Sequence, residues 1–393
     1  MGLATALLAA AAALFVAWNN GSNNAANAVG TAVGARVLSA RRALLMAAVA
    51  IFAGSIALGI YVTNTIMRGI VNTMSISGPV VIKGMISVLI AAGLWTLLST
   101  FFKVPMSVHV CIVGSVIGFG LAVGSSTISW GEVFKILIAW AVVPLVTAGM
   151  AYGLYAVFGK AFRDPSLARV AVIAASYLTA GAPTVLIMLK TVNASSIVLV
   201  AVVTSVVSTV AAVAVYAYWK HVVGKGRNAL MEASRILLIM AAASMAFSFG
   251  ANDVANSAGP LAAILYAEGW GDVDQVMWLS LLISAIGLSA GIALWGSKVI
   301  ETVGERITPL SPPSAYVAQM SATLAMLVVS RLGIPVSTSM AIVGGVMGVG
   351  LSKGIRTLNL KVLVRIFGMW LLALPATIAL TYALTYTLMH SGL

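Results

Sequence analysis

Long apolar runs constrain the fold of this chain more than any other feature of its sequence. Runs of roughly 17 to 25 residues recur from one end to the other, each long enough for an α-helix to cross about 30 Å of hydrocarbon. Lipid cannot satisfy unpaired backbone groups, so such segments span as helices or as a closed barrel. The alternation expected of a membrane barrel is absent from the sequence. We therefore predict an all-α polytopic membrane protein.

The charged residues fit a membrane protein better than a nucleic-acid-binding one. The net charge is +13, but only 8% of the 393 residues are charged. The basic residues lie mainly in short connections between apolar runs, which is the pattern that orients membrane proteins. Lipid is the predicted surrounding, and a nucleic-acid partner is not expected.

An internal repeat organises the chain. The string GSNNAAN that begins at Gly21 recurs as GANDVAN at Gly250, and the string PMS at Pro105 recurs as PVS at Pro335. Both pairs keep nearly the same separation, as do several glycines and a tryptophan further along. Such self-similarity is typical of a duplicated structural unit.

The repeat divides the chain into three parts. We predict a first repeat over 1–158, two linking helices with a cytoplasmic loop over 159–231, and a second repeat over 232–393. Each repeat has an apolar segment broken by the Asn-rich motif, a full span, two segments hinged at the Pro-x-Ser motif and a final span. This pattern gives about 12 hydrophobic segments in all.

The basic connections predict the orientation. Lys and Arg gather in 159–169 and 220–235, which places both connections in the cytoplasm of a multi-pass plasma-membrane protein. If the hinged pairs are re-entrant hairpins, both termini lie outside and the halves form an inverted repeat, with a site near the midplane. Each hairpin arm of about 17 residues would reach about 26 Å, so full crossing by each arm stays open.

Asparagines gather in both copies of the first motif. Asn23, Asn24 and Asn27 in the first copy, and Asn252 and Asn256 in the second, lie inside apolar stretches. Buried amides commonly form hydrogen bonds between membrane helices, which is the plain structural explanation. The duplication of the motif favours a shared binding site instead.

Asp253 is the acidic residue placed deepest in an apolar segment; the other Asp and Glu residues fall near predicted ends or connections. An intramembrane carboxylate indicates a functional site, and we predict that Asp253 binds a coupling cation. Gly21 and Gly250 are predicted to unwind the helix at each motif. The freed carbonyls would then ligate Na⁺ beside the Asn and Asp oxygens.

The second motif predicts an anion site. A proline just before a fresh apolar helix makes the following residues first-turn residues, whose N–H groups, hydroxyls and helix dipole attract a tetrahedral oxyanion. These residues are Ser107 in the first copy and Ser337, Thr338 and Ser339 in the second. A serine that only caps a helix is the commoner meaning of one such motif. Two copies in opposed halves favour the anion.

Three basic residues near the hinges have alternative roles. Lys103 and Arg331 precede the two hinges, where they would attract an anion if the hinges are deep, or snorkel if the hinges lie at the surface. His109 lies beyond Ser107 and would donate to the anion, relay a proton or simply face a neighbouring helix.

At these motifs the chain resembles the inorganic phosphate transporter (PiT) family. GANDVAN at Gly250 is similar to the duplicated GANDxAN signature of that family, and PVSTS at Pro335 to its PVSTT motif. The resemblance implies a homodimeric symporter of inorganic phosphate, driven by Na⁺ or H⁺, without another cofactor. It assigns cation binding, with Na⁺ as one candidate, to Asn23, Asn27, Asn252, Asp253 and Asn256, and phosphate binding to Ser107, Ser337, Thr338 and Ser339. From the residues themselves we add Asn24 to the predicted cation site and His109 to the predicted phosphate site.

Two departures from the family pattern bear on substrate and coupling. Asn24 stands where the first copy usually has Asp, and Val108-His109-Val110 stands where the family has T-T-H. The missing carboxylate would lower the number of coupled cations or change the driving ion. Sulfate permeases belong to the same broad family, so sulfate is the alternative substrate.

Two other classes of protein fit less well. An anion channel would use similar helix ends around a continuous pore, whereas opposed broken helices favour alternating access. An enzyme is not predicted, because the sequence offers no nucleophile–base pair or metal triad at credible spacing.

Overall fold

The computed structural model describes residues 2–101, 107–161, 165–191, 196–223, 229–297 and 310–391. Within these ranges the regular structure is helical, apart from one isolated bridge between Val71 and Ile128. Ten stretches of the described chain are long and apolar enough to cross a membrane. The prediction of an all-α protein with membrane-length helices is confirmed.

The described elements form a first part, two linking helices and a last part, with the predicted boundaries at 158 and 231 lying inside α6 and α9. The first part contains α1 (Leu3–Gly34), α2 (Ala40–Leu58), α3 (Ile60–Asn64), the π-helical turn η1 (Thr65–Gly69), η2 (Thr73–Ser75), α4 (Gly78–Phe101), α5 (Val108–Val123), η3 (Ser125–Thr127) and α6 (Trp130–Ala161). Two linking helices follow, α7 (Pro165–Thr191) and α8 (Ile197–Val223). The last part contains α9 (Ala229–Asp253), α10 (Ala255–Ala267), α11 (Val273–Trp295), α13 (Pro312–Arg331), α14 (Thr338–Lys353), η5 (Ile355–Thr357) and α15 (Leu360–His390).

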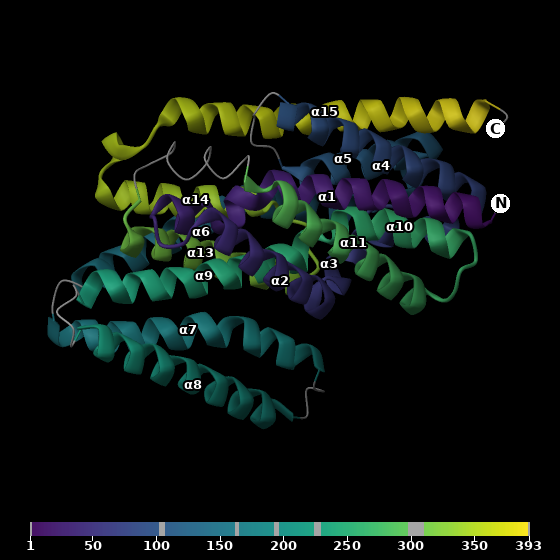
Figure 1. Ribbon diagram of the computed structural model, residues 1–393. Coiled ribbons are helices and arrows are strands. Elements are labelled where there is room, and N and C mark those ends of the chain that lie inside the picture. Colours follow the sequence, from purple (N-terminus) through teal and green to yellow (C-terminus); the bar gives the residue numbers. More distant parts are fainter. Residues whose placement is uncertain are drawn as a thin grey trace.

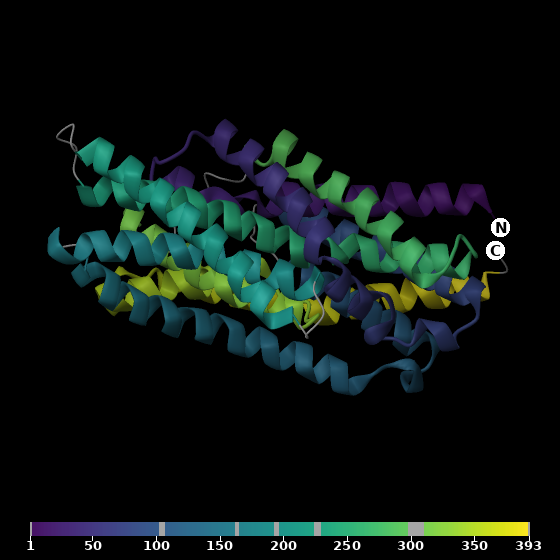
Figure 2. The same cartoon turned by 90° about the horizontal axis from the view of Figure 1, so that it is seen from below.

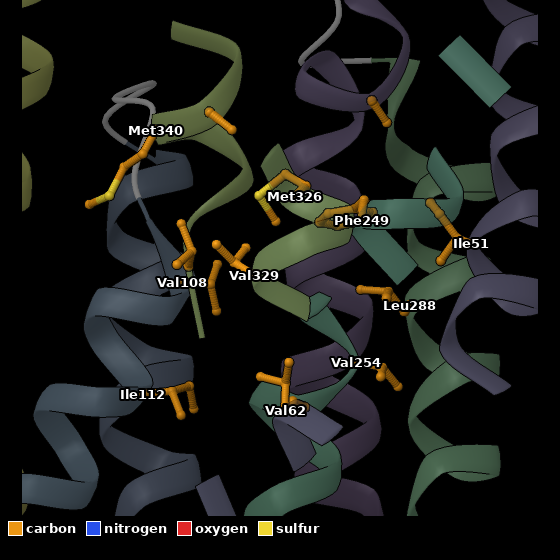
Figure 3. Packing of buried hydrophobic residues seen from close by; sticks show 14 of the residues in the cluster. Ile51, Val62, Val108, Ile112, Phe249, Val254, Leu288, Met326, Val329 and Met340 are labelled. Atoms are coloured by element: carbon orange, nitrogen blue, oxygen red, sulfur yellow. The ribbon is translucent and has the colours of Figure 1, made fainter. Parts of the chain in front are cut away.

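The helices of the first and last parts pack against one another in a reciprocal pattern. The helix α1 packs on α11 while α9 packs on α2, and α5 packs on α15 while α14 packs on α6. Figure 3 shows buried side chains from these elements in one cluster, among them Ile51 of α2, Val108 of α5, Phe249 of α9 and Met340 of α14. The pair α7 and α8 lies to one side, next to α9 (Figure 1).

The hinged segments form two helical hairpins. The open end of the α4–α5 hairpin is closed by hydrogen bonds from the Asn72 N–H to the Thr127 carbonyl at 3.0 Å and from the Ser129 N–H to the Ile70 carbonyl at 2.9 Å. At the open end of the α13–α14 hairpin, the Lys353 ammonium donates to the Ser314 hydroxyl at 3.1 Å.

The two hairpins point in opposite directions. In Figure 1, α5 extends toward the end of the molecule that carries both termini, and α14 extends toward the other end. Figure 2 confirms that the N- and C-termini share one end. The starts of α5 and α14 therefore face the middle of the molecule from opposite sides. The tip of the first hairpin, with Lys103, Pro105 and Met106, lies outside the described residues.

The predicted unwinding at the two motif glycines is wrong. The helix α1 is continuous from Leu3 to Gly34, and Gly250 lies inside α9, which ends three residues later at Asp253. The reason is close packing: a Cβ at Gly21 would clash with the Leu288 carbonyl, and one at Gly250 with the Ile51 carbonyl. These glycines let two helix backbones touch, and the only break in the described motif segments falls at Val254, between α9 and α10.

Candidate functional site

The junction of α9 and α10 meets the first turns of both opposed helices. Asp253, at the end of α9, accepts a hydrogen bond from the Thr338 hydroxyl of α14, with 2.6 Å between the hydroxyl and Oδ1. Its other carboxylate oxygen, Oδ2, lies 3.6 Å from Nδ1 of His109 in α5. All three side chains are buried. One carboxylate thus contacts the helix starts of both hairpins.

Asn252 fastens the second hairpin to this junction. Its amide nitrogen donates to the Ser330 hydroxyl at 2.9 Å and to the Ile334 carbonyl at 3.3 Å, and its amide oxygen accepts from the Val336 N–H at 3.2 Å. These contacts hold the hinge between α13 and α14, which is the segment that leads into Ser337.

The first copy of the Asn-rich motif reaches the same place through a series of amides. Asn20 donates to the Asp253 carbonyl at 3.2 Å, and Asn24 donates to the Asn20 side-chain oxygen at 2.6 Å. Asn27 donates both to the Asn24 oxygen at 2.6 Å and to the Ser339 hydroxyl at 2.7 Å. The predicted residues of α1, α9 and α14 are therefore brought together in one polar network, and Asn23 is buried on the same stretch of α1.

Two buried polar atoms of the site have no hydrogen-bond partner within the described chain, Oδ1 of Asn256 and Nε2 of His109. The Asn256 amide nitrogen faces His109 Nδ1 at 3.4 Å. A buried polar atom without a partner costs about 1–3 kcal/mol of desolvation, and a ligand that bonded to these two atoms would recover that cost. Amide and carboxylate oxygens are the ligands that hard cations such as Na⁺ prefer.

The two hinge serines differ in their hydrogen bonds. The Ser107 hydroxyl accepts from the Val110 N–H at 3.3 Å, so Ser107 caps α5 in the ordinary way. Ser337 also begins its helix, but its side chain makes no capping bond. Ser107 therefore caps α5 as an acceptor, and its hydroxyl, like that of Ser337, still has a proton to donate to a ligand.

Two residues at the site have no role in the predictions from sequence. Gln319 of α13 donates to the Ala28 carbonyl at 2.8 Å and accepts from the Thr31 hydroxyl at 2.7 Å, which ties α13 to α1 one turn from Asn27. Trp140 of α6 donates to the Pro335 carbonyl at 2.8 Å and so supports the hinge. Gln319 could have been found from the sequence, because it is a lone amide inside an apolar span. Nothing in the sequence indicates that Trp140 contacts Pro335.

The fold and site define the class of protein. Membrane-length apolar helices enclose a buried carboxylate, a network of amides and two opposed helix starts, so the chain is an integral membrane protein with a polar site in its interior.

Comparison with known proteins identifies the family. The model of the phosphate transporter family matches residues 20–381, and the chain belongs to this family. A protein of Chlamydia pneumoniae named as a phosphate permease is 36% identical, with 92% of this chain and 93% of that protein aligned. The chloroplastic inorganic phosphate transporter 2-1 of Arabidopsis thaliana is 29% identical over 98% of this chain and 73% of its own length. A solved structure, described as the sodium-dependent phosphate transporter, is 30% identical, with a TM-score of 0.92 over 98% of this chain and 99% of that one.

Proposed function

We propose that this protein is a secondary active transporter that carries inorganic phosphate together with a cation, Na⁺ or H⁺, by alternating access. The observation that carries the proposal is the position of Asp253, which contacts the first turn of α14 through Thr338 and that of α5 through His109. Membership of the phosphate transporter family supports phosphate as the substrate, and the sodium-dependent relative supports Na⁺ as the coupling ion.

The proposed anion position is the start of α14. The Ser337 hydroxyl and the unpaired N–H groups of the first turn would donate to phosphate oxygens, and the helix dipole adds partial positive charge there. The proposed cation position is next to it, with Oδ2 of Asp253 and Oδ1 of Asn256 as ligands. Opposite charges bound this close stabilise each other, and this linkage makes each ion raise the affinity for the other.

Alternating access would come from two inverted repeats, 1–158 and 232–393, joined by the helices of 159–231. The reciprocal packing of α1 on α11 and α9 on α2 supports this division, as do the hairpins that point in opposite directions (Figure 1). Both termini at one end agree with the proposed placement of both outside the plasma membrane. The homodimer stays a prediction.

Transport assays separate this function from its alternatives. In proteoliposomes, labelled phosphate should accumulate above its external concentration only while a Na⁺ or proton gradient is imposed, because downhill cation flow drives the anion uphill. Flux that only ever runs downhill would identify an anion channel. Labelled sulfate measured in parallel tests the other substrate, and preferential sulfate uptake would contradict the assignment of phosphate.

Ser337→Ala should weaken phosphate affinity more than cation affinity. A hydrogen bond to a charged group contributes about 1.5–3 kcal/mol, so we expect KM for phosphate to rise on the order of tenfold. The measurement is phosphate competition against labelled phosphate, together with the Na⁺ or H⁺ concentration that half-activates uptake. Ser107→Ala tests the equivalent residue of the first copy: it removes a cap from α5 and should lower thermal stability. Unchanged phosphate competition in Ser337→Ala would remove this serine from the site.

A further inference from the structure

A polar cavity lies beside the hinge of the α13–α14 hairpin. This cavity of about 410 Å³ is formed where α3 and η1 face the start of α11 and the end of α13. Its polar lining consists of Tyr61, Asn64, Thr65, Arg68, Asp274 and Arg331. We call this cavity the arginine vestibule, after Arg68 and Arg331.

The two guanidinium groups are held in place by neutral partners. Arg331 lies over the Tyr61 ring, with 4.3 Å between its guanidinium carbon and the ring centroid. Arg68 donates from Nε to the Asn64 side-chain oxygen at 2.7 Å. Both contacts leave guanidinium N–H groups free, since each Arg carries five donors.

Charge in the arginine vestibule favours an anion. Asp274 is its one acidic lining residue, and Asp274 forms no ion pair with either arginine in the described chain. Two positive groups against one negative group leave the hollow with a net positive charge. Arginine forks match the oxygens of a phosphate group, so phosphate is the ligand class that this lining suits.

The arginine vestibule adjoins the proposed transport site. Arg331 directly follows Ser330, and the lining residue Gly333 directly precedes Ile334. Ser330 and Ile334 are the residues to which the Asn252 amide donates. The lining residues Arg331 and Gly333 are therefore direct chain neighbours of the two residues whose contacts with Asn252 hold the hinge before Ser337.

We propose that the arginine vestibule is a separate capture site for free inorganic phosphate, which binds there before it reaches the start of α14. This role rests on the proposed function. Of the two roles considered for Arg331, it favours attraction of the anion over snorkelling to the membrane surface. A charged cleft of this kind raises the local concentration of its substrate, and its effect falls as salt rises.

The test combines transport and binding. In proteoliposomes, the double variant Arg68→Gln/Arg331→Gln should raise KM for phosphate on the order of tenfold at low ionic strength, with the maximal rate unchanged. The difference from wild type should shrink at high salt. Arg365→Gln removes the same charge from an exposed position on α15 and serves as the control. A double variant that behaves like Arg365→Gln at both salt concentrations would overturn the proposal.

Equilibrium binding of labelled inorganic phosphate to the purified protein separates this proposal from the proposed function. Wild type should bind labelled phosphate at two sites, and the double variant should lose one of them and keep the site at the start of α14. Asp253→Asn should keep the arginine site even where transport is absent. A double variant that binds as many phosphate ions as wild type contradicts the capture site. A thermal unfolding profile like that of wild type shows that each variant is folded.

A lipid headgroup carries the same phosphate chemistry, so the vesicle composition is varied. The arginine effect should be equal in vesicles of phosphatidylcholine alone and in vesicles that also contain phosphatidylglycerol. An effect confined to the anionic vesicles would assign the arginines to lipid and overturn the capture of free phosphate.

Discussion

Asp253→Asn should abolish cation-dependent phosphate uptake while the protein stays folded. The amide keeps the shape of the carboxylate and still accepts the Thr338 hydroxyl, but it lacks the negative charge that a cation requires. At the cation concentration that half-activates wild type, we expect the initial rate to fall on the order of 100-fold, which corresponds to about 2.8 kcal/mol of cation binding. The measurement is the initial rate of labelled phosphate uptake against the concentration of the cation.

Glu132→Gln is the control for removal of a negative charge. Glu132 pairs with Lys135 on the surface of α6, at 2.6 Å between Oε1 and Nζ, and exposed pairs of this kind contribute little. Uptake by Glu132→Gln should equal that of wild type. Normal Na⁺-stimulated or H⁺-stimulated transport in Asp253→Asn would refute the role assigned to this carboxylate.

Gly250→Ala should destabilise the protein, although alanine is the better helix former. A Cβ at Gly250 would clash with the Ile51 carbonyl, so α9 and α2 would have to separate. Overpacking of this kind costs about 1–3 kcal/mol. A lower midpoint of thermal unfolding and a smaller monodisperse fraction in detergent are the expected results, and Gly21→Ala should repeat them through the Leu288 carbonyl of α11.

Gly153→Ala is the matched control for this substitution. Gly153 lies in α6, and a Cβ there would meet nothing within 4 Å. The same change should be neutral or stabilising by up to about 1 kcal/mol, because alanine has the higher helix propensity. Equal shifts of the unfolding midpoint in Gly250→Ala and Gly153→Ala would contradict close packing at Gly250.

The sequence predicted the helical segments, and it singled out polar motif residues that the structure brings together, for a physical reason. Lipid forces each apolar run into a helix, and duplicated polar motifs inside such runs must face each other or remain without partners. Asp253, Thr338 and Asn27 accordingly lie in one network. Their functional roles remain predictions.

The details that the sequence did not predict depend on contacts between distant segments. A glycine within a helix can allow the helix to unwind, which frees backbone carbonyls, or it can allow a neighbouring helix to pack closely. At Gly21 the second holds, because the backbone of α11 lies against it, and this contact cannot be read from the sequence. Ser107 and Ser337 occupy equivalent motifs, yet only the first caps its helix. The hydrogen bond from Trp140 to the Pro335 carbonyl joins residues far apart in the chain, and no local sequence pattern predicts it.

The three hydrogen bonds of Asn252 have a consequence for motion. They join the end of α9 to the segment between α13 and α14, so these elements should move as one rigid body. His109, by contrast, faces Asp253 across a longer separation of 3.6 Å, with α5 on the other side. We therefore expect the gap that opens and closes during a transport cycle to run between α5 and this rigid body, along the face where the two ions would sit.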